Sequence, residues 1–254
     1  MMIKVVVPIS GGKDSQVCAK LAVEAHGPDA VAGLFCDTQF EHPLTYEHID
    51  RIADLYHIQI HKICAGSVEE QIKKYKKFPG GNARFCTYNL KIAASRDWYL
   101  QKAGSKGFEV WIGVRSGESS ARKKRYSNRT EDELMPMHEF MPKNYPKTLE
   151  RLNVMARLPI LDWGTQEVFD YLDGEENPLY KEGFGRVGCF PCLAAGDKHK
   201  ELAFGFDETG AKHLAIARSL EPIVGRSVFT SKGGQLRNDS GQRDCFEGCA
   251  LCAI

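Results

Sequence analysis

The chain has 254 residues, of which 43% are hydrophobic and 26% are charged, and its formal net charge at pH 7 is +1. This composition is typical of a globular protein, and the length suits one large or two small domains. A net charge so close to zero favours no class of partner, so any contact with nucleic acid must come from a local patch.

The start of the chain carries no long apolar segment of the signal-peptide kind, and no apolar stretch approaches the length of a membrane span. We therefore expect a cytoplasmic protein with no membrane partner. The nine cysteines then favour metal or redox chemistry over disulfides. Cys18, Cys36 and Cys64 lie among apolar or mixed residues and are expected in the core. The other six lie in glycine- and proline-rich contexts: Cys86, Cys189, Cys192, Cys245, Cys249 and Cys252.

The first half of the chain alternates short apolar runs with helical patterns, which predicts βαβ units and a mainly parallel sheet. The expected strands cover residues 3–9, 30–36, 58–63 and 108–114. The expected helices cover residues 16–25, 46–56, 68–77 and 90–103.

The second half is less regular. Residues 118–145 are charged and lack a periodic pattern, which predicts an active-site loop or a mobile segment. The chain is rich in loops after Gly174, and its tail from Ser231 ends in three cysteines. The remaining regular segments expected here are a core run at 156–161 and helices at 165–172 and 212–220.

A hexapeptide between the first expected strand and the first expected helix carries the strongest functional signal. It reads Ser10, Gly11, Gly12, Lys13, Asp14 and Ser15. Two glycines let the backbone approach an anion closely, and the amides and dipole of a helix N-terminus favour negative charge. The spacing matches neither G-x-x-x-x-G-K-[ST] nor G-x-G-x-x-G. The hexapeptide therefore predicts a phosphate cradle of a different kind.

Polar residues follow two further strands. Asp37 and Thr38 end the second strand, where a carboxylate and a hydroxyl could bind the ribose or adenine of a nucleotide. The cap of the next helix is an equally good interpretation of that pair. Gly113 ends the fourth strand and is followed by Arg115 and Arg122, whose planar guanidinium groups suit phosphate or sulfate oxygens.

The pair Cys189 and Cys192 has the spacing that brings two thiolates to one metal ion or cluster. Two thiolates are too few, and Cys86 is the natural third ligand. A structural zinc site completed by a tail cysteine and a redox dithiol remain open. The three tail cysteines could carry sulfur into the site or supply a missing metal ligand.

Together these strings resemble the superfamily of PP-loop proteins that contains phosphoadenosine-phosphosulfate reductases and ATP sulfurylases. The resemblance extends from about residue 3 to about residue 195. It rests on residues 10–15, 36–38, 84–91, 113–122, 177–180 and 186–192. It implies an α/β fold with an open, mainly parallel sheet, helices on both faces and a loop-rich, cysteine-bearing C-terminal extension. We accordingly expect a nucleotide-binding domain at 1–160 and the extension at 161–254.

The complete PP-loop favours ATP as the ligand, since the sulfonucleotide reductases that resemble this chain usually have a degraded loop. Reductases with iron–sulfur clusters carry an adjacent Cys-Cys pair, and here Phe85 stands at the partner position. The layout is most similar to the PP-loop component of DNA phosphorothioation systems and to phage-borne reductase-like proteins. The resemblance therefore implies an ATP pyrophosphatase that adenylates a substrate for sulfur transfer.

The resemblance also implies roles for the residues. The β,γ-phosphates of ATP would lie on residues 10–15 with Mg²⁺ nearby. The implied catalytic residues are Lys13, Asp14, Arg115 and Arg122. Further nucleotide contacts would come from Asp37, Thr38 and Gly113. The implied ligands of an iron–sulfur cluster of the 4Fe–4S type, with zinc as the alternative metal, are Cys86, Cys189 and Cys192.

Two other functions stay open at this point. One is a reductase that releases sulfite from an adenylyl sulfate through a tail cysteine. The other is a non-catalytic nucleotide-binding module stabilised by zinc. The expected partners of the adenylating enzyme are ATP and a sulfur donor such as a cysteine desulfurase, with DNA or RNA as candidate acceptors and a homodimer as a candidate assembly.

Overall fold

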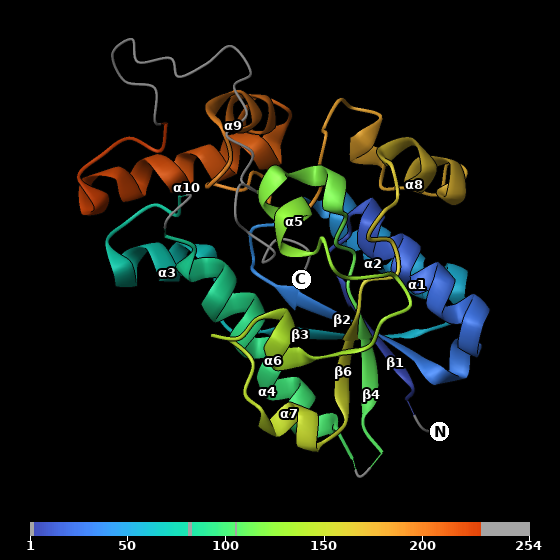
Figure 1. Ribbon diagram of the computed structural model, residues 1–254. Helices are drawn as coiled ribbons and strands as arrows, with labels where there is room; N and C mark the ends of the chain where they lie inside the picture. The colour runs from blue at the N-terminus through green and yellow to red at the C-terminus, as the bar shows by residue number, and fades with distance from the viewer. Residues whose placement is uncertain (1–2, 81–82, 105, 230–254) are drawn as a thin grey trace.

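The structure is a computed structural model that describes residues 3–80, 83–104 and 106–229. The described residues form a six-stranded sheet in the order β3-β2-β1-β4-β6-β5, seen near the centre of Figure 1. All neighbouring strands pair in parallel except β5, which is antiparallel to β6. The strands are β1 (Val5–Ile9), β2 (Val31–Asp37), β3 (Gln59–Cys64), β4 (Phe108–Trp111), β5 (Met135–Pro136) and β6 (Val154–Arg157).

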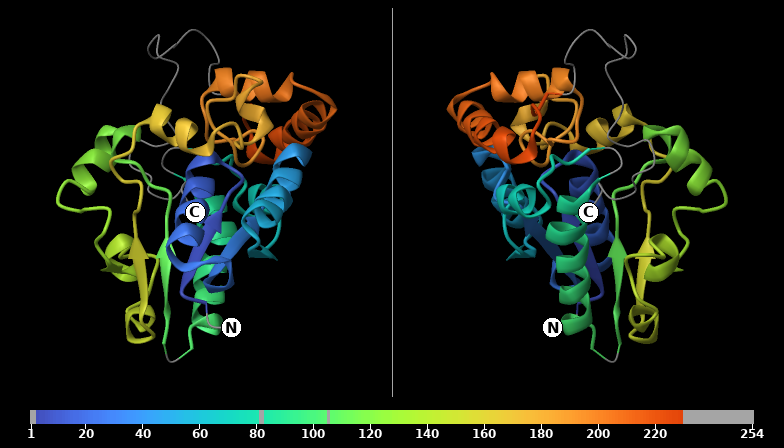
Figure 2. Two further views of the ribbon diagram at one scale, coloured as in Figure 1. Left: turned by 90° about the vertical axis from the view of Figure 1, so that its right-hand side faces the viewer. Right: turned by 90° about the vertical axis from the view of Figure 1, so that its left-hand side faces the viewer.

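Both faces of the sheet are covered by helices, as the two side views of Figure 2 show. Side chains of β1 alternate between two apolar clusters, with Val6 in one and Val5 and Val7 in the other. A strand buried on both faces has no polar side, which explains why the sequence of β1 is a continuous apolar run. The fold class is the expected one, an open and mainly parallel α/β sheet.

One face of the sheet carries three helices whose apolar residues join those of the strands: α1 (Lys13–His26), α2 (Pro43–Tyr56) and α8 (Thr165–Leu172). The other face carries η2 (Thr87–Ile92), a turn of π-helix that continues into α4 (Ala93–Lys102). Helix α1 begins three residues earlier than the sequence pattern indicates, so Lys13, Asp14 and Ser15 form its first turn.

The segment 118–145, for which the sequence predicted an active-site loop or a mobile segment, contains short regular elements. It forms α5 (Ser120–Arg125), β5 and α6 (Met137–Phe140), after the short turn η3 (Ser116–Glu118). Its large side chains are buried in the same cluster as those of β4 and β6. The buried members are Tyr126, Met135, Met137, Phe140, Met141 and Tyr145.

The chain after β6 crosses back over the carboxyl ends of the strands (Figure 1). It forms α8, the turn η4 (Pro178–Tyr180), α9 (Asp197–Phe204) and α10 (Glu208–Val224), of which α9 was not expected. Helix α10 packs against α9 and against α3 (Val68–Tyr75). The division at residue 160 stays a prediction, although Val168 and Leu172 of α8 belong to the same cluster as α1. The remaining short elements are η1 (Pro28–Ala30) and α7 (Thr148–Arg151).

Two of the three cysteines expected in the core are buried. Cys18 and Cys36 are almost inaccessible, whereas Cys64 is exposed at the end of the edge strand β3, so that expectation was wrong. An edge strand has one sheet neighbour and leaves its side chains more accessible. Within the described residues, no helix is long and apolar enough to cross a membrane.

His48 of α2 gives the fold a predicted pH dependence. Its Nε2 lies 2.9 Å from Gln16 Oε1, and its buried Nδ1 has no hydrogen-bond partner among the described residues. Burial, with a smaller contribution from Arg51, lowers the pKa of His48 from 6.5 to about 4. Between about pH 4 and pH 6.5 the unfolded chain binds more protons than the folded protein, so the free energy of unfolding rises with pH. A shift of this size corresponds to about 3 kcal/mol.

Urea unfolding at both ends of that window measures the effect. In His48→Gln we expect most of the extra pH dependence to disappear, because the titrating group is absent. The matched control is His57→Asn at the exposed, left-handed C-cap of α2, a position that suits asparagine. Equal pH dependence in the wild type and His48→Gln would contradict the prediction.

Candidate functional site

The hexapeptide forms the turn between β1 and α1, at the carboxyl end of the central strand. Gly11 has φ +75, and a Cβ there would lie 2.5 Å from Thr45 Cγ2. Both facts demand glycine at this position. Gly12 is the N-cap of α1, and its amide donates to Ser10 Oγ at 3.4 Å. The turn therefore directs the first amides of a helix toward the space beyond the strand ends.

Two serines stabilise this turn from inside. The Ser15 hydroxyl donates to the Gly12 carbonyl at 2.8 Å, and the Ser10 amide donates to Ser15 Oγ at 3.2 Å. The two hydroxyl oxygens are 3.3 Å apart. Ser15 is buried and Ser10 is partly exposed. Ser15 therefore shapes the loop, while Ser10 remains able to contact a ligand.

Asp14 lies between two cations. Its Oδ2 is 3.1 Å from Lys13 Nζ, and its Oδ1 accepts a bond of 2.7 Å from Arg115 Nε. Burial lowers the pKa of Lys13, and the nearby Arg115 lowers it further, whereas Asp14 raises it. The carboxylate thus fixes both cations at the first turn of α1, and both of its oxygens are already engaged.

The two arginines of the 113–122 string are joined through one carboxylate. Glu118 lies 3.5 Å from Arg115 Nη2 and also forms an ion pair with Arg122. Arg115 donates a further bond of 3.1 Å to Thr165 Oγ1 at the start of α8. Arg115 is 4% exposed and Arg122 is 2% exposed, so the structure places both guanidinium groups inside the protein.

Gly113 has a packing reason to be glycine. A Cβ on Gly113 would lie 2.8 Å from the carbonyl carbon of Asp14 and 3.0 Å from the Ser15 amide nitrogen. The end of β4 therefore touches the backbone of the first turn of α1. This contact sets the position of the phosphate loop on the sheet.

A segment far along the chain covers the loop. The Asn177 side-chain amide donates to the Gly11 carbonyl at 3.1 Å, and the Lys13 amide donates to the Tyr180 hydroxyl at 3.0 Å. Asn177 is fully buried, and burial raises the pKa of the Tyr180 phenol. The Lys13 ammonium lies 5.4 Å from the centre of the Tyr180 ring. The phosphate loop is thus enclosed by polar and aromatic groups of η4.

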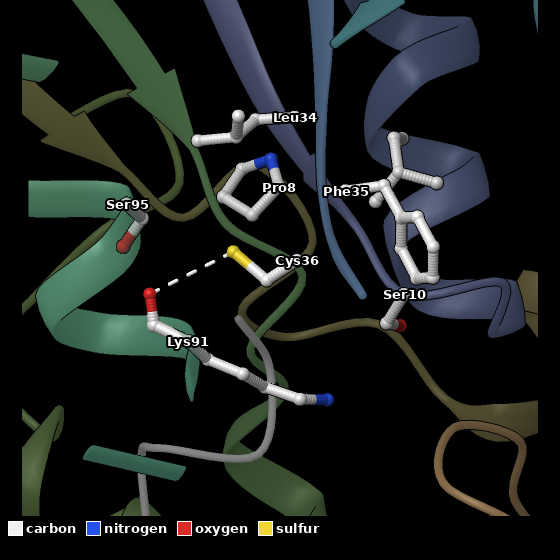
Figure 3. A pocket seen from close by; sticks show the side chains of 8 residues that line it. Pro8, Ser10, Leu34, Phe35, Cys36, Lys91 and Ser95 are labelled. Atoms are coloured by element: carbon white, nitrogen blue, oxygen red, sulfur yellow. Dashed lines mark hydrogen bonds between the residues drawn. The ribbon is translucent and has the colours of Figure 1, made fainter. Parts of the chain in front are cut away.

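A small cavity opens beside Ser10, between the carboxyl ends of β1 and β2 and the π-helical turn η2. Figure 3 shows the Cys36 thiol pointing to the carbonyl of Lys91, to which it donates at 3.7 Å. The wall is largely apolar, and Ser10 belongs both to this wall and to the phosphate loop. The lining residues are Pro8, Ile9, Ser10, Leu34, Phe35, Cys36, Lys91 and Ser95.

Asp37 and Thr38 are both engaged within the protein. Asp37 Oδ1 accepts bonds of 2.8 Å from the Gln39 amide and from the Tyr46 hydroxyl. The buried Thr38 hydroxyl donates to Glu41 at 2.7 Å. Neither residue caps α2, because the cap is His42, whose side chain accepts from the Leu44 amide. The helix-cap interpretation of the pair was therefore wrong.

Cys192 is a near neighbour of both Cys86 and Cys189. Cys189 Sγ is 3.3 Å from Thr38 Oγ1 and 3.7 Å from Glu41 Oε1, and burial raises its pKa to about 12. Burial also raises the pKa of Cys86 to about 11, and the neighbouring Cys192 adds to that shift. Both thiols are thus held in their neutral form.

A cluster ligand set is not assembled in the described part of the chain. No group of three or more cysteine, histidine or acidic side chains there is arranged to hold a metal ion. The assignment of Cys86, Cys189 and Cys192 as ligands of an iron–sulfur cluster or a zinc ion stays a prediction. Cys245, Cys249 and Cys252 lie outside the described residues, so their suggested role stays a prediction.

A family model for the phosphoadenosine phosphosulfate reductase domain matches residues 4–195. The chain belongs to this reductase-domain family. An uncharacterised 37.8 kDa protein of Escherichia phage 186 is 30% identical, over 78% of this chain and 69% of that protein. An uncharacterised protein of Methanocaldococcus jannaschii is also 30% identical, but this chain spans 36% of its length.

Other relatives of this reductase-domain protein carry functional names. The adenosine 5′-phosphosulfate reductase of Neisseria meningitidis is 25% identical, over 80% of this chain and 83% of that protein. Among solved structures, a phosphoadenylyl-sulfate reductase from Candida auris is similar, with 18% identity, a TM-score of 0.49, and coverage of 74% of this chain and 81% of that chain.

Sequence reasoning missed several polar residues at the site of this family member. Glu41 accepts hydrogen bonds from Thr38, Phe40, Tyr46 and Cys189. Glu118 links the two arginines. Glu118 lies in the 113–122 string and Tyr180 in the 177–180 string, so both stood within the motifs without an assigned role. The spacing of Glu118, three residues after Arg115 and four before Arg122, is the signal that could have identified it.

Proposed function

We propose that this chain is an ATP pyrophosphatase that adenylates an acceptor and thereby activates it for sulfur transfer. The observation that carries the proposal is the complete loop at residues 10–15, with a buried Lys13 fixed by Asp14 at a helix N-terminus. A site of this kind suits the terminal phosphates of a nucleoside triphosphate.

Ser10 supports a position for the nucleotide, because it belongs to the loop and is partly exposed. The triphosphate would run over the loop toward Lys13, and the adenosine would lie beyond the carboxyl ends of β1 and β2, outside the small cavity that Ser10 also lines. The amides of α1 suit phosphate oxygens. Mg²⁺ would be held mainly by the phosphates, since both oxygens of Asp14 are paired with cations.

The proposed reaction is attack of an acceptor oxygen on the α-phosphorus of ATP. The new bond joins that oxygen to the α-phosphorus, the bond to the bridging oxygen of the β-phosphate breaks, and pyrophosphate leaves. Lys13 neutralises charge that grows on the leaving group. Arg115 acts through Asp14 as a positioning residue, because its bonds fix that carboxylate. The outer sulfur of a persulfide, supplied by a partner such as a cysteine desulfurase, then attacks the adenylated centre and AMP leaves. A thiol reductant supplies the two electrons that cleave the remaining sulfur–sulfur bond and free the thiolated product.

The test is an assay for products with ATP, Mg²⁺ and candidate acceptors. We expect AMP and pyrophosphate in equal amounts, with release increased by the correct acceptor. Formation of ADP and phosphate, or tight ATP binding with no cleavage in the presence of every acceptor tried, would count against the proposal. The assay needs no assumption about a metal cluster, and no step above passes through one.

A sulfonucleotide reductase is the second candidate, favoured by the family match and by relatives named adenosine 5′-phosphosulfate reductase. Sulfite release from an adenylyl sulfate in the presence of thioredoxin would support it. The two functions separate clearly, because the reductase would release sulfite without forming pyrophosphate.

A further inference from the structure

The end of helix α3 carries an exposed strip of basic residues around one aromatic ring. Residues 73–77 read Lys-Lys-Tyr-Lys-Lys, and all five are exposed. We call these residues the lysine–tyrosine strip. Tyr75 in the middle of the strip is 44% exposed, which is a large accessible area for an aromatic side chain.

The strip concentrates positive charge in a protein whose overall charge is close to zero. Lys73 pairs with Glu69 at 2.7 Å on the same helix. Among the residues that the structure describes, Lys74, Lys76 and Lys77 take part in no ion pair. Three ammonium groups therefore face solvent within four positions of the chain, a density that suits a polyanion.

The aromatic ring in the strip is held in a fixed orientation. Tyr75 stacks on Phe85 with ring centres 4.6 Å apart and planes inclined by 23°. The Asn89 side-chain amide donates to the Tyr75 hydroxyl at 3.1 Å and to Gln71 at 2.8 Å. Lys74 Nζ lies 5.6 Å from the centre of the Tyr75 ring. An exposed ring fixed in this way can receive a stacked base at low entropic cost.

The strip lies at the same end of the sheet as the phosphate loop. Helix α3 follows the carboxyl end of β3, just as the loop follows the parallel strand β1 (Figure 1). Phe85, on which Tyr75 stacks, directly precedes Cys86. Tyr88, in the π-helical turn η2 that also carries Lys91, is 40% exposed. The basic and aromatic surface thus adjoins the elements that form the cavity.

We propose that the lysine–tyrosine strip binds a single-stranded polynucleotide, with phosphates on the lysines and a base stacked on Tyr75. The inference rests on the proposed function and names the class of its acceptor. Stacked aromatic rings among lysines are the combination that single-stranded nucleic acids require. DNA and RNA share this chemistry, and the experiment distinguishes them.

The experiment measures fluorescence anisotropy with labelled single-stranded DNA and RNA of roughly 16 nucleotides, the upper end of a typical site. In the triple variant Lys74→Gln/Lys76→Gln/Lys77→Gln we expect a loss of affinity of at least tenfold. The slope of log affinity against log salt should be less steep by about 2 in this variant than in the wild type, since each of the three lost phosphate contacts contributes about 0.7. Tyr75→Ala should weaken binding by roughly tenfold, and Tyr75→Leu, which keeps an apolar side chain without a ring, by nearly as much.

The matched control is Lys4→Gln/Lys102→Gln/Lys106→Gln, which removes three exposed lysines near the opposite end of the sheet. Equal losses in the two triple variants, or no binding of either polynucleotide by the wild type, would overturn the inference. Release of pyrophosphate from ATP alone should be unchanged in the strip variants. A wild type that cleaves ATP but binds no polynucleotide refutes this inference alone, whereas one that binds polynucleotide but never cleaves ATP refutes the proposed function.

Discussion

Lys13→Met is expected to lower the rate of pyrophosphate release by about 10²–10³-fold, the usual cost of losing one preorganised contact to developing charge. Lys13 is 4% exposed, and its ammonium lies 3.1 Å from the carboxylate of Asp14. Burial lowers the pKa of Lys13, and bound phosphates would favour its charged form. The fold should tolerate methionine, because a buried cation of lowered pKa stabilises the free protein little.

The rate is measured as AMP formed per enzyme molecule per unit time. Unfolding curves of the same variants show whether the fold is kept. The matched control is Lys20→Met, about two turns further along α1, where the partly exposed ammonium pairs with Glu175 at 3.6 Å. We expect Lys20→Met to keep the wild-type rate. Full activity in Lys13→Met would remove the main support for the proposed function.

Gly113→Ala is expected to reduce stability by about 2–3 kcal/mol and to cost activity on the order of 10²-fold. A single methyl group at Gly113 would press on backbone atoms of Asp14 and Ser15 at 2.8–3.0 Å. Backbone cannot rotate out of the way as a side chain can, so α1 or β4 must shift. Either movement displaces the phosphate loop from the sheet.

The comparison variant is Gly117→Ala, four residues later in the same segment. A Cβ at Gly117 meets no atom within 4 Å among the described residues. We expect near wild-type stability and activity there, measured by urea unfolding and by pyrophosphate release. If the two alanine variants behave alike, the contact between β4 and α1 does not position the loop.

The phosphate loop was predictable because its signal is local. Ser10, the two glycines and Lys13 are contiguous and form the turn of a strand–turn–helix unit, in which the positive φ of Gly11 favours glycine. The strands β1 to β4 were predictable for a similar reason, since each is a short apolar run within an alternating α/β pattern. The first turn of α1 was missed because its polar residues hide the helical periodicity.

What the sequence did not reveal depends on distant contacts. Residues 118–145 look polar because buried Tyr126 and Phe140 alternate with surface charges over elements of two to six residues. Such short elements give no measurable period. The contact between Tyr180 and Lys13 joins residues 167 positions apart, and no local pattern encodes it. The proximity of Cys86 to Cys192 likewise joins segments that are far apart in the chain.

The cover of the phosphate loop by η4 has a consequence during synthesis. Asn177 and Tyr180 reach Gly11 and Lys13 across more than 160 residues of chain. A nascent polypeptide that has just emerged from the ribosome contains the loop but lacks these partners. These contacts can therefore form only after residue 180 has been translated, which would couple the proposed nucleotide binding to a late stage of folding.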